Sequence, residues 1–225
     1  MEKKALKSIE YLKGKNRILF LNTSNRWAGH KELPKSTALA KKMAAELGNV
    51  EVIDVPTLMI HPCDGNISAR VGNECGLKEA LLKDKTRNPS GNHRCWVNFN
   101  TSEDELWKIS QPLLACDCVV FFASVRWGQT NSIHQKLIER LSWIENRHST
   151  LGEDNILKGI DAGIILTGHN WRGEQVLNTQ KDVLKYFGFN VVDELCWNWQ
   201  FTTPDDESGT SYLEAIAAFD KELLG

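Results

Sequence analysis

Residues 119–129 read VVFFASVRWGQ, and this stretch decides the fold class. An apolar run leads into a polar segment, Ser124 to Gly128, and a helical pattern follows. A buried parallel strand that ends in a short polar loop is where α/β proteins place ligands. Trp127 offers an aromatic ring, and Gly128 allows the backbone to approach a flat ligand closely. The segment therefore predicts a site for a planar ligand.

Composition limits the possible partners. The 225-residue chain is 41% hydrophobic and 25% charged, which is typical of a soluble globular protein, and it is long enough for one large α/β domain or two small ones. It shows no repeat and no interdomain linker, so we expect a single domain over residues 1–225. Its net charge of −2 disfavours a nucleic-acid partner. No apolar run approaches the roughly 20 residues of a membrane span, and residues 1–15 do not resemble a secretion signal. We therefore expect a cytoplasmic protein without membrane partners, whose six cysteines are reduced thiols.

Strand and helix patterns alternate along the chain. Stripes such as Leu39, Met43 and Leu47 predict helices, and Asn131 or Ser132 can cap the clearest one. This alternation predicts an α/β fold with a doubly wound, five-stranded parallel sheet and helices on both faces. Residues 61–101 form an irregular insertion, and residues 1–15 form an extension with helical composition. The expected strands cover residues 17–22, 50–55, 118–122, 162–167 and 190–196.

The first of three polar loops, residues 22–37, has the outline of a phosphate site. Ser36 or Thr37 would lie at a helix N-terminus, where backbone N–H groups favour an anion. Ordinary N-capping by either residue is the alternative. The loop has neither a Walker A nor a GxGxxG pattern, so a Rossmann-type dinucleotide is disfavoured. Its other candidate ligands are Thr23, Ser24 and Arg26.

The other two loops are candidates for holding a ring. The second is residues 124–129, although Trp127 can equally be packed on the core. The third is residues 167–173, which read TGHNWRG. There Gly168 can lie against the edge of a ligand, and neutral His169 or backbone N–H groups can hydrogen-bond a ring carbonyl. A solvated His169 is the alternative.

These loops resemble those of the flavodoxin-like FMN reductases. That family includes NAD(P)H-dependent FMN reductases, quinone reductases and iron–sulfur flavoproteins. Its ring-binding turn carries Pro and Tyr where this chain has Ser124 and Arg126. The matching residues are Ser24-Asn25-Arg26, Ser36-Thr37, Asp117, Ser124-Val125-Arg126-Trp127-Gly128, Gln135-Lys136 and Arg140.

The resemblance implies a flavodoxin-like sheet of order 2-1-3-4-5, FMN as cofactor and NAD(P)H as electron donor. It also implies a small acceptor such as a quinone or a flavin, and a homodimer or homotetramer. The FMN phosphate would bind the first loop and the isoalloxazine ring the other two. Hydride transfer needs no acid–base residue of the protein, so no catalytic residue is predicted. The predicted cofactor-binding residues are Thr23, Ser24, Arg26, Ser36, Thr37, Ser124, Val125, Arg126, Trp127, Gly128, Thr167, Gly168 and His169.

The cysteines do not predict a metal centre. Cys63, Cys75 and Cys95 lack the spacing of the iron–sulfur flavoproteins, and a cluster normally needs four thiolates. A zinc site from these thiols with His61 or His93 matches no recognised spacing. No metal is therefore predicted.

Three functional alternatives stay open at this stage. An electron carrier without its own nicotinamide substrate is disfavoured, because such carriers tend to be strongly acidic and this chain has a net charge of −2. The second alternative is an FMN-binding module. The third is a flavodoxin-like fold that has lost its cofactor, because Ser124 and Arg126 differ from the Pro and Tyr of the family's ring-binding turn. Arg126 itself either stabilises negative charge on a reduced ring or contributes only its backbone.

Overall fold

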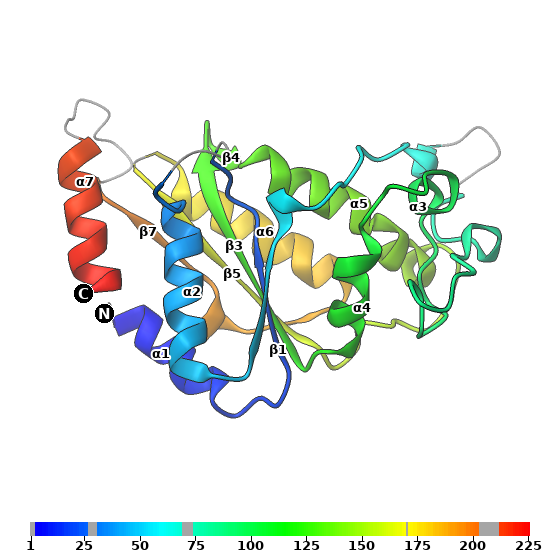
Figure 1. Cartoon of the computed structure of the whole chain (residues 1–225), viewed down its shortest axis with the longest axis horizontal. Coiled ribbons are helices and arrows are strands. Elements are labelled where there is room, and N and C mark those ends of the chain that lie inside the picture. Colours follow the sequence, from blue (N-terminus) through cyan, green and yellow to red (C-terminus); the bar gives the residue numbers. More distant parts are fainter. Residues whose placement is uncertain (1–2, 27–30, 69–73, 170, 203–211) are drawn as a thin grey trace.

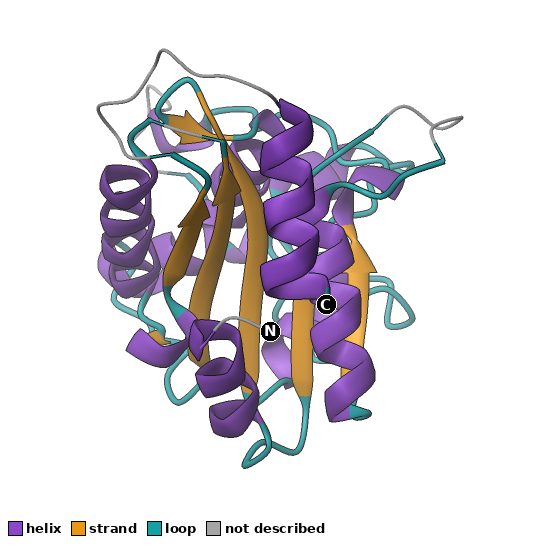
Figure 2. Cartoon of the chain, turned by 90° about the vertical axis from the view of Figure 1, so that its left-hand side faces the viewer, coloured by secondary structure: helices purple, strands orange, loops and turns teal. Residues whose placement is uncertain are grey.

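A twisted sheet runs through the centre of the molecule, with helices on both faces (Figure 1, Figure 2). The computed structural model describes residues 3–26, 31–68, 74–169, 171–202 and 212–225. The strand order is β2-β1-β3-β5-β6, and β7 pairs with the carboxyl half of β5. The predicted order 2-1-3-4-5 is thereby confirmed. The parallel strands are β1 (Ile18–Asn22), β2 (Val50–Asp54), β3 (Cys118–Arg126), β5 (Asp161–Gly168), β6 (Asn190–Val191) and β7 (Trp197–Gln200).

The helices cover the two faces of the sheet in sets. Helices α1, α2 and α7 pack on one face, and α4, α5 and α6 pack on the other. Alternate residues of β3 are buried on opposite faces of the sheet. Phe121 packs in the core beneath α4, α5 and α6, and Phe122 packs in the core beneath α1, α2 and α7. This two-sided burial explains why the strand is apolar throughout. The helices are α1 (Lys3–Leu12), α2 (Lys35–Leu47), α3 (Trp96–Asn100), α4 (Trp107–Ala115), α5 (Ser132–Ser149), α6 (Gly173–Phe187) and α7 (Tyr212–Phe219).

The single strand predicted over residues 190–196 is wrong. The pairing stops at Val191, and a short 3-10 helix, η4 (Asp193–Leu195), separates β6 from β7. Leu195 is fully buried, and a Cβ added at Gly163 of β5 would overlap it. The chain therefore leaves the sheet after β6, and Leu195 packs against β5 in the space that Gly163 leaves open. The chain then rejoins the sheet as β7.

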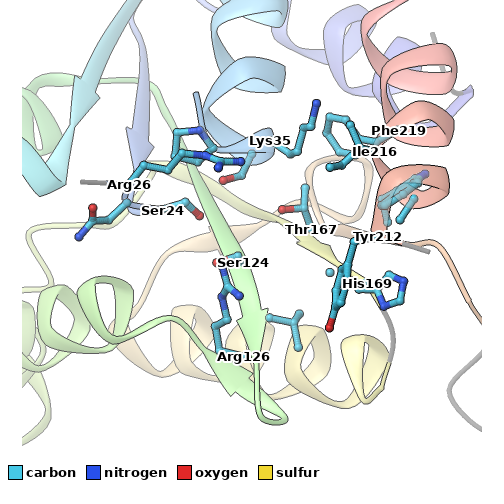
Figure 3. A pocket seen from close by; sticks show the side chains of 17 residues that line it. Ser24, Arg26, Lys35, Ser124, Arg126, Thr167, His169, Tyr212, Ile216 and Phe219 are labelled. Atoms are coloured by element: carbon cyan, nitrogen blue, oxygen red, sulfur yellow. The ribbon is translucent and has the colours of Figure 1, made fainter. Parts of the chain in front are cut away.

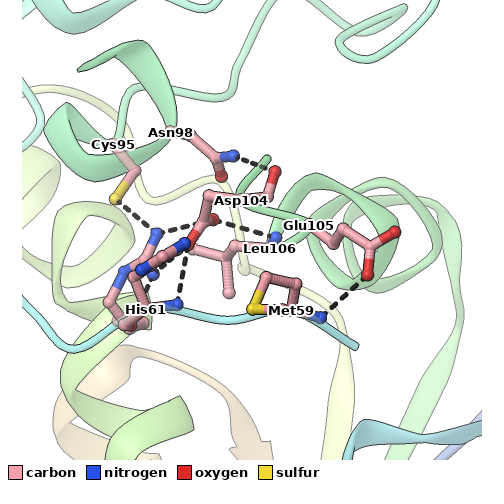
Figure 4. A network of polar contacts seen from close by, with 8 residues as sticks. Met59, His61, Cys95, Asn98, Asp104, Glu105 and Leu106 are labelled. Carbon is pink, nitrogen blue, oxygen red and sulfur yellow. Dashed lines mark hydrogen bonds and ion pairs between the residues drawn. The ribbon is translucent and has the colours of Figure 1, made fainter. Parts of the chain in front are cut away.

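A buried ion pair attaches the irregular insertion to α5. Arg140 Nη1 lies 2.6 Å from Asp104 Oδ2, and both side chains are fully buried. Asp104 also accepts a hydrogen bond from the His61 N–H at 2.9 Å, and Arg140 donates to His61 O at 2.7 Å (Figure 4). Burial alone would raise the pKa of Asp104, but the bonds from Arg140 and His61 hold it below its ordinary value. Arg140, one of the residues that carry the family resemblance, is thus a structural anchor here.

The thiols of the chain are not cross-linked. All six cysteines lie within the described residues, and none forms a disulfide. Among the described residues, no three His, Cys, Asp or Glu side chains are arranged to hold a metal ion. A helix with the length and the apolar composition needed to cross a membrane is absent from the described part of the chain.

Two histidines are buried in the core beside neutral partners. His134 Nε2 lies 3.0 Å from Gln180 Oε1, and His93 Nδ1 lies 2.6 Å from Ser110 Oγ. Burial lowers the pKa of each imidazole to about 4. Both rings therefore stay neutral in the folded protein at pH values where an unfolded chain would bind protons.

We expect these histidines to make the fold sensitive to mild acid. Between an unfolded pKa of about 6.5 and the folded value, the unfolded state binds more protons, so the free energy of unfolding falls as the pH falls. Each buried histidine contributes at most about 1.4 kcal/mol per pH unit. Urea denaturation at about pH 7 and pH 5 measures this loss. The loss of unfolding free energy between the two pH values should be about half as large in His134→Gln and unchanged in His148→Gln. An equal loss in the unaltered protein and in both variants would contradict the assignment.

Candidate functional site

A cleft of about 430 Å³ opens at the carboxyl ends of β1, β3, β5 and β7. Its walls are the loop after β1, the N-terminus of α2, the ends of β3 and β5, and α7 (Figure 3). The strand order reverses between β1 and β3, and ligands of doubly wound sheets bind at such a switch point. The volume also falls within the usual range for small-molecule sites. Position and size together mark this cleft as the candidate site.

Most of the predicted cofactor-binding residues line this cleft. Thr23 and Thr37 do not line it; both are buried behind it, and Thr23 Oγ1 donates to Phe122 O at 3.0 Å. Trp127 and Gly128 also lie outside the described lining. The predicted residues that line the cleft are Ser24, Arg26, Ser36, Ser124, Val125, Arg126, Thr167, Gly168 and His169.

Two buried hydroxyls that line one end of the cleft, and a third behind them, have no hydrogen-bond partner among the described residues. They belong to Ser24, Ser36 and Thr37, which are 8%, 1% and 3% exposed. Pro34 holds the N-cap position of α2 and makes no side-chain cap, so N-capping by Ser36 or Thr37 is excluded. The two residues instead lie in the first turn, where backbone N–H groups have no partner within the helix. Hydroxyls and helix dipole together form an anion-binding end.

The charge of the cleft is positive, although the chain is slightly acidic. Arg26, Lys35 and Arg126 line it, and no carboxylate stands among the described lining residues. Lys35 Nζ lies 2.7 Å from Asp220 Oδ1, just beyond the end of α7. The lining therefore favours an anionic ligand.

The expected polar loop over residues 124–128 is instead a strand extension and a tight hairpin. β3 continues to Arg126 and pairs with the antiparallel β4 (Gln129–Thr130), with Arg126 opposite Gln129. Trp127 and Gly128 form the two-residue turn with φ values of 50° and 68°, a geometry that suits a type I′ hairpin. Trp127 is 92% exposed at the tip, so packing on the core is excluded. Gly128 serves the turn, and within this segment Ser124, Val125 and Arg126 face the cleft.

Backbone strain gathers in the two loops beside the cleft. Trp127, Trp171 and Arg172 have positive φ, and within the described ranges no other non-glycine residue does. The first belongs to the hairpin after β3, and the other two precede α6. Such conformations are costly for residues with a Cβ and cluster at functional sites.

His169 forms part of an aromatic wall. Its ring lies 4.6 Å from that of Tyr212 and 5.7 Å from that of Phe201, measured between centroids. Its Nε2 atom is buried and has no hydrogen-bond partner, so the solvated alternative does not hold. His169 therefore presents an unsatisfied polar atom beside apolar ring surface.

Sequence reasoning missed the wall that α7 provides. Tyr212, Ile216 and Phe219 recur at helical spacing, but periodicity alone does not distinguish a core face from a cleft face. The exposure of Tyr212, 73%, is the structural sign that this stripe is not simply core. The lining residues outside the prediction are Asn25, Pro34, Lys35, Trp199, Tyr212, Ala215, Ile216 and Phe219.

Asn131 holds the first two loops together. It occupies the N-cap position of α5, but its side chain makes no cap hydrogen bond, contrary to the expected role. Its Nδ2 donates to Thr23 O at 2.8 Å, and its Oδ1 accepts from the Ser124 N–H at 3.1 Å. The carboxamide thus fixes the exits of β1 and β3 relative to each other.

The comparisons with known proteins agree on the fold. No family model matches the chain, and no curated protein gives a significant match. Among solved structures, RosB with a bound 8-demethyl-8-formylriboflavin-5'-phosphate intermediate aligns at a TM-score of 0.60 and 16% identity, over 92% of this chain and 72% of RosB. Azoreductase AzrA aligns at a TM-score of 0.54 and 12% sequence identity. An azoreductase from Bacillus anthracis aligns at a TM-score of 0.53 and 13% identity, and both alignments cover 92% of this chain and 96% of the azoreductase chain. Together with the strand order, these alignments show that the chain has the flavodoxin-like fold.

We expect Asn131→Ala to loosen the cleft. The substitution leaves the Ser124 N–H and Thr23 O without partners in a buried place, at a cost of about 1–3 kcal/mol in the free energy of unfolding. The exposed neighbour Gln129→Ala is the control and should change stability by less than about 0.5 kcal/mol. Urea denaturation and amide hydrogen exchange at Ser124 measure the two effects. Equal stability and equal exchange in both variants would contradict the bridging role.

Proposed function

We propose that this protein is an FMN-dependent oxidoreductase that passes electrons from NAD(P)H to a small acceptor, such as a quinone or a flavin. The observation that carries the proposal is the pair of unpartnered hydroxyls that line one end of the cleft, Ser24 after β1 and Ser36 in the first turn of α2, with the unpartnered hydroxyl of Thr37 behind them. The flavin compound bound to RosB and the names of the two azoreductases support it from proteins of the same fold.

The donor set at one end of the cleft fits the phosphate of FMN. A phosphate has several acceptor oxygens, and hydroxyls together with first-turn N–H groups are the donors that it needs. Arg26 and Lys35 add positive charge nearby. Buried hydroxyls without partners are costly to a fold, so a ligand that satisfies them explains their presence.

The remaining walls fit a flat, amphipathic ring. Ser124, Val125 and Arg126 lie on one side of the opening, and Thr167, Gly168 and His169 end the neighbouring strand (Figure 3). Tyr212 and Ile216 of α7 add apolar surface. Bound FMN would supply the chemistry of accepting and donating a hydride.

The residues of the chain would position the ring and adjust its surroundings. Arg126 lines the cleft, and a guanidinium beside the ring would stabilise the negative charge that accompanies reduction. The α7 wall would exclude water from one side, while the exposed rim leaves room for a nicotinamide and then an acceptor. None of these tasks requires a general acid or base.

The first test is flavin binding followed by turnover. FMN added to purified protein should quench tryptophan fluorescence saturably and raise the melting temperature, because a ligand of the folded state stabilises it. The loaded protein should then oxidise NADH or NADPH in the presence of a quinone. Absence of FMN binding at a large excess would overturn the proposal. Binding without turnover with either nicotinamide would favour the electron carrier or the FMN-binding module.

The second test separates the phosphate from the ring. The double variant Ser36→Ala/Thr37→Val removes two hydroxyls while it keeps the threonine shape, and it should weaken FMN by about tenfold or more. Riboflavin lacks the phosphate, so its affinity should change little. Ser132→Ala, at an exposed position at the start of α5, is the control. Equal losses for FMN and riboflavin would argue against a phosphate site at this helix.

A further inference from the structure

A second groove lies between α5, α6 and the short helix η2 (Asn66–Ser68), and we call it the α5–α6 groove. It encloses about 550 Å³, within the usual range for small-molecule sites, and shares no described lining residue with the cleft. Its walls carry the apolar side chains of Ile67, Val183, Tyr186 and Phe187. Its charged lining groups are two carboxylates, Glu145 and Asp182.

Glu145 is the unusual member of this lining. The residue is only 5% exposed, and its Oε1 has no hydrogen-bond partner. The arginines nearest along α5 are committed elsewhere, Arg140 to Asp104 and Arg147 to Glu153. A buried carboxylate oxygen without a partner among the described residues is costly, and each such atom calls for an explanation.

Asp182 does not compensate for this charge. It lies on α6 with an exposed side chain, 3.7 Å from Lys185, which is itself largely exposed. An exposed pair of this kind is weak and well screened by solvent. The groove therefore combines a largely buried carboxylate, one of whose oxygens has no partner among the described residues, with a second, weakly paired carboxylate at a more exposed place.

The apolar lining is arranged to receive the body of a ligand. Tyr186 is 71% exposed and Ile67 is 47% exposed, so both offer surface to an incoming molecule. The face of a tyrosine ring attracts a cation as well as apolar groups. Neither an anion nor a neutral molecule would relieve the unpaired charge of Glu145.

We propose that the α5–α6 groove binds a small organic cation, a primary amine on an apolar or aromatic body. The ammonium group would pair with Glu145, and the body would rest on Ile67 and Tyr186. This site is independent of the proposed flavin cleft, because it uses other residues on other elements.

Benzylamine is the probe, with benzyl alcohol as its uncharged counterpart. Calorimetric titration of the full chain should show saturable binding of benzylamine and much weaker binding of the alcohol. Glu145→Gln should weaken benzylamine by about tenfold or more, because it removes a buried charged partner. Glu139→Gln alters an exposed carboxylate on the same helix and should leave the affinity unchanged. An affinity in Glu145→Gln equal to that of the unaltered protein would overturn the proposal.

Two further measurements cover the case in which Glu145 has a purely structural role. Without ligand, Glu145→Gln should unfold at the same or a higher urea concentration, since a neutral amide is easier to bury than an unpaired charge. Tyr186→Ala, at an exposed position, should keep the fold and weaken benzylamine severalfold. A destabilised Glu145→Gln protein together with unchanged binding in Tyr186→Ala would show a structural carboxylate and refute the amine site. Absence of saturable benzylamine binding to the unaltered protein would refute it as well.

Discussion

The side chain of Asn131 joins the exits of β1 and β3, and the geometry of the cleft depends on this connection. One carboxamide bonds Thr23 O and the Ser124 N–H, while the Asn131 N–H donates to Ser124 O at 2.9 Å. The hydroxyl of Ser24 follows directly after Thr23, and the ring-facing residues of β3 follow Ser124. Beyond the β1–β3 pairing and the bonds from Thr23 to Phe122 O, the N-cap residue of α5 therefore holds the two halves of the cleft together.

The cleft retains features that destabilise a fold, and the ion pair at the middle of α5 shows the contrast. The Asp104 carboxylate is buried, yet it is satisfied by Arg140 and by backbone N–H groups. Ser24, Ser36 and Thr37 are equally buried and unsatisfied, and three strained residues lie in the loops nearby. Unpaired hydroxyls at the edge of a cleft are where a bound ligand would supply the missing partners.

The sequence predicted the sheet well because parallel strands are buried on both faces and read as short apolar runs. It failed at the ends of the elements, where tertiary pairing overrides local character. Ser124 and Arg126 are polar, but β5 pairs with Ser124 and β4 pairs with Val125 and Arg126, so the strand continues. Leu195 breaks an otherwise plausible strand, because Gly163 opens space beneath it. Each failure involves a contact between segments far apart in the sequence.

Part of the candidate site could be predicted because its position follows from the topology of the sheet. Loops after β1, β3 and β5 converge by topology alone, so most of their chosen residues do line the cleft. Trp127 was chosen for its chemistry, but the hairpin directs it to solvent. Pro34 occupies the N-cap position of α2 without a side-chain cap, so Ser36 and Thr37 lie in the first turn and do not have the capping role that their position indicated. The α7 wall depends on how the last helix docks, which no local pattern encodes.

The distribution of charge gives the two candidate sites different preferences. Arg26, Lys35 and Arg126 line the cleft without a carboxylate among the described residues, whereas Glu145 and Asp182 line the α5–α6 groove. A phosphate would meet unpaired negative charge in the groove, and an ammonium would meet guanidinium groups in the cleft. Like charges at close range disfavour binding, so each proposed site would disfavour the ligand proposed for the other. The net charge of the sequence does not reveal this separation of basic and acidic residues, because the separation arises only when the fold brings distant residues together.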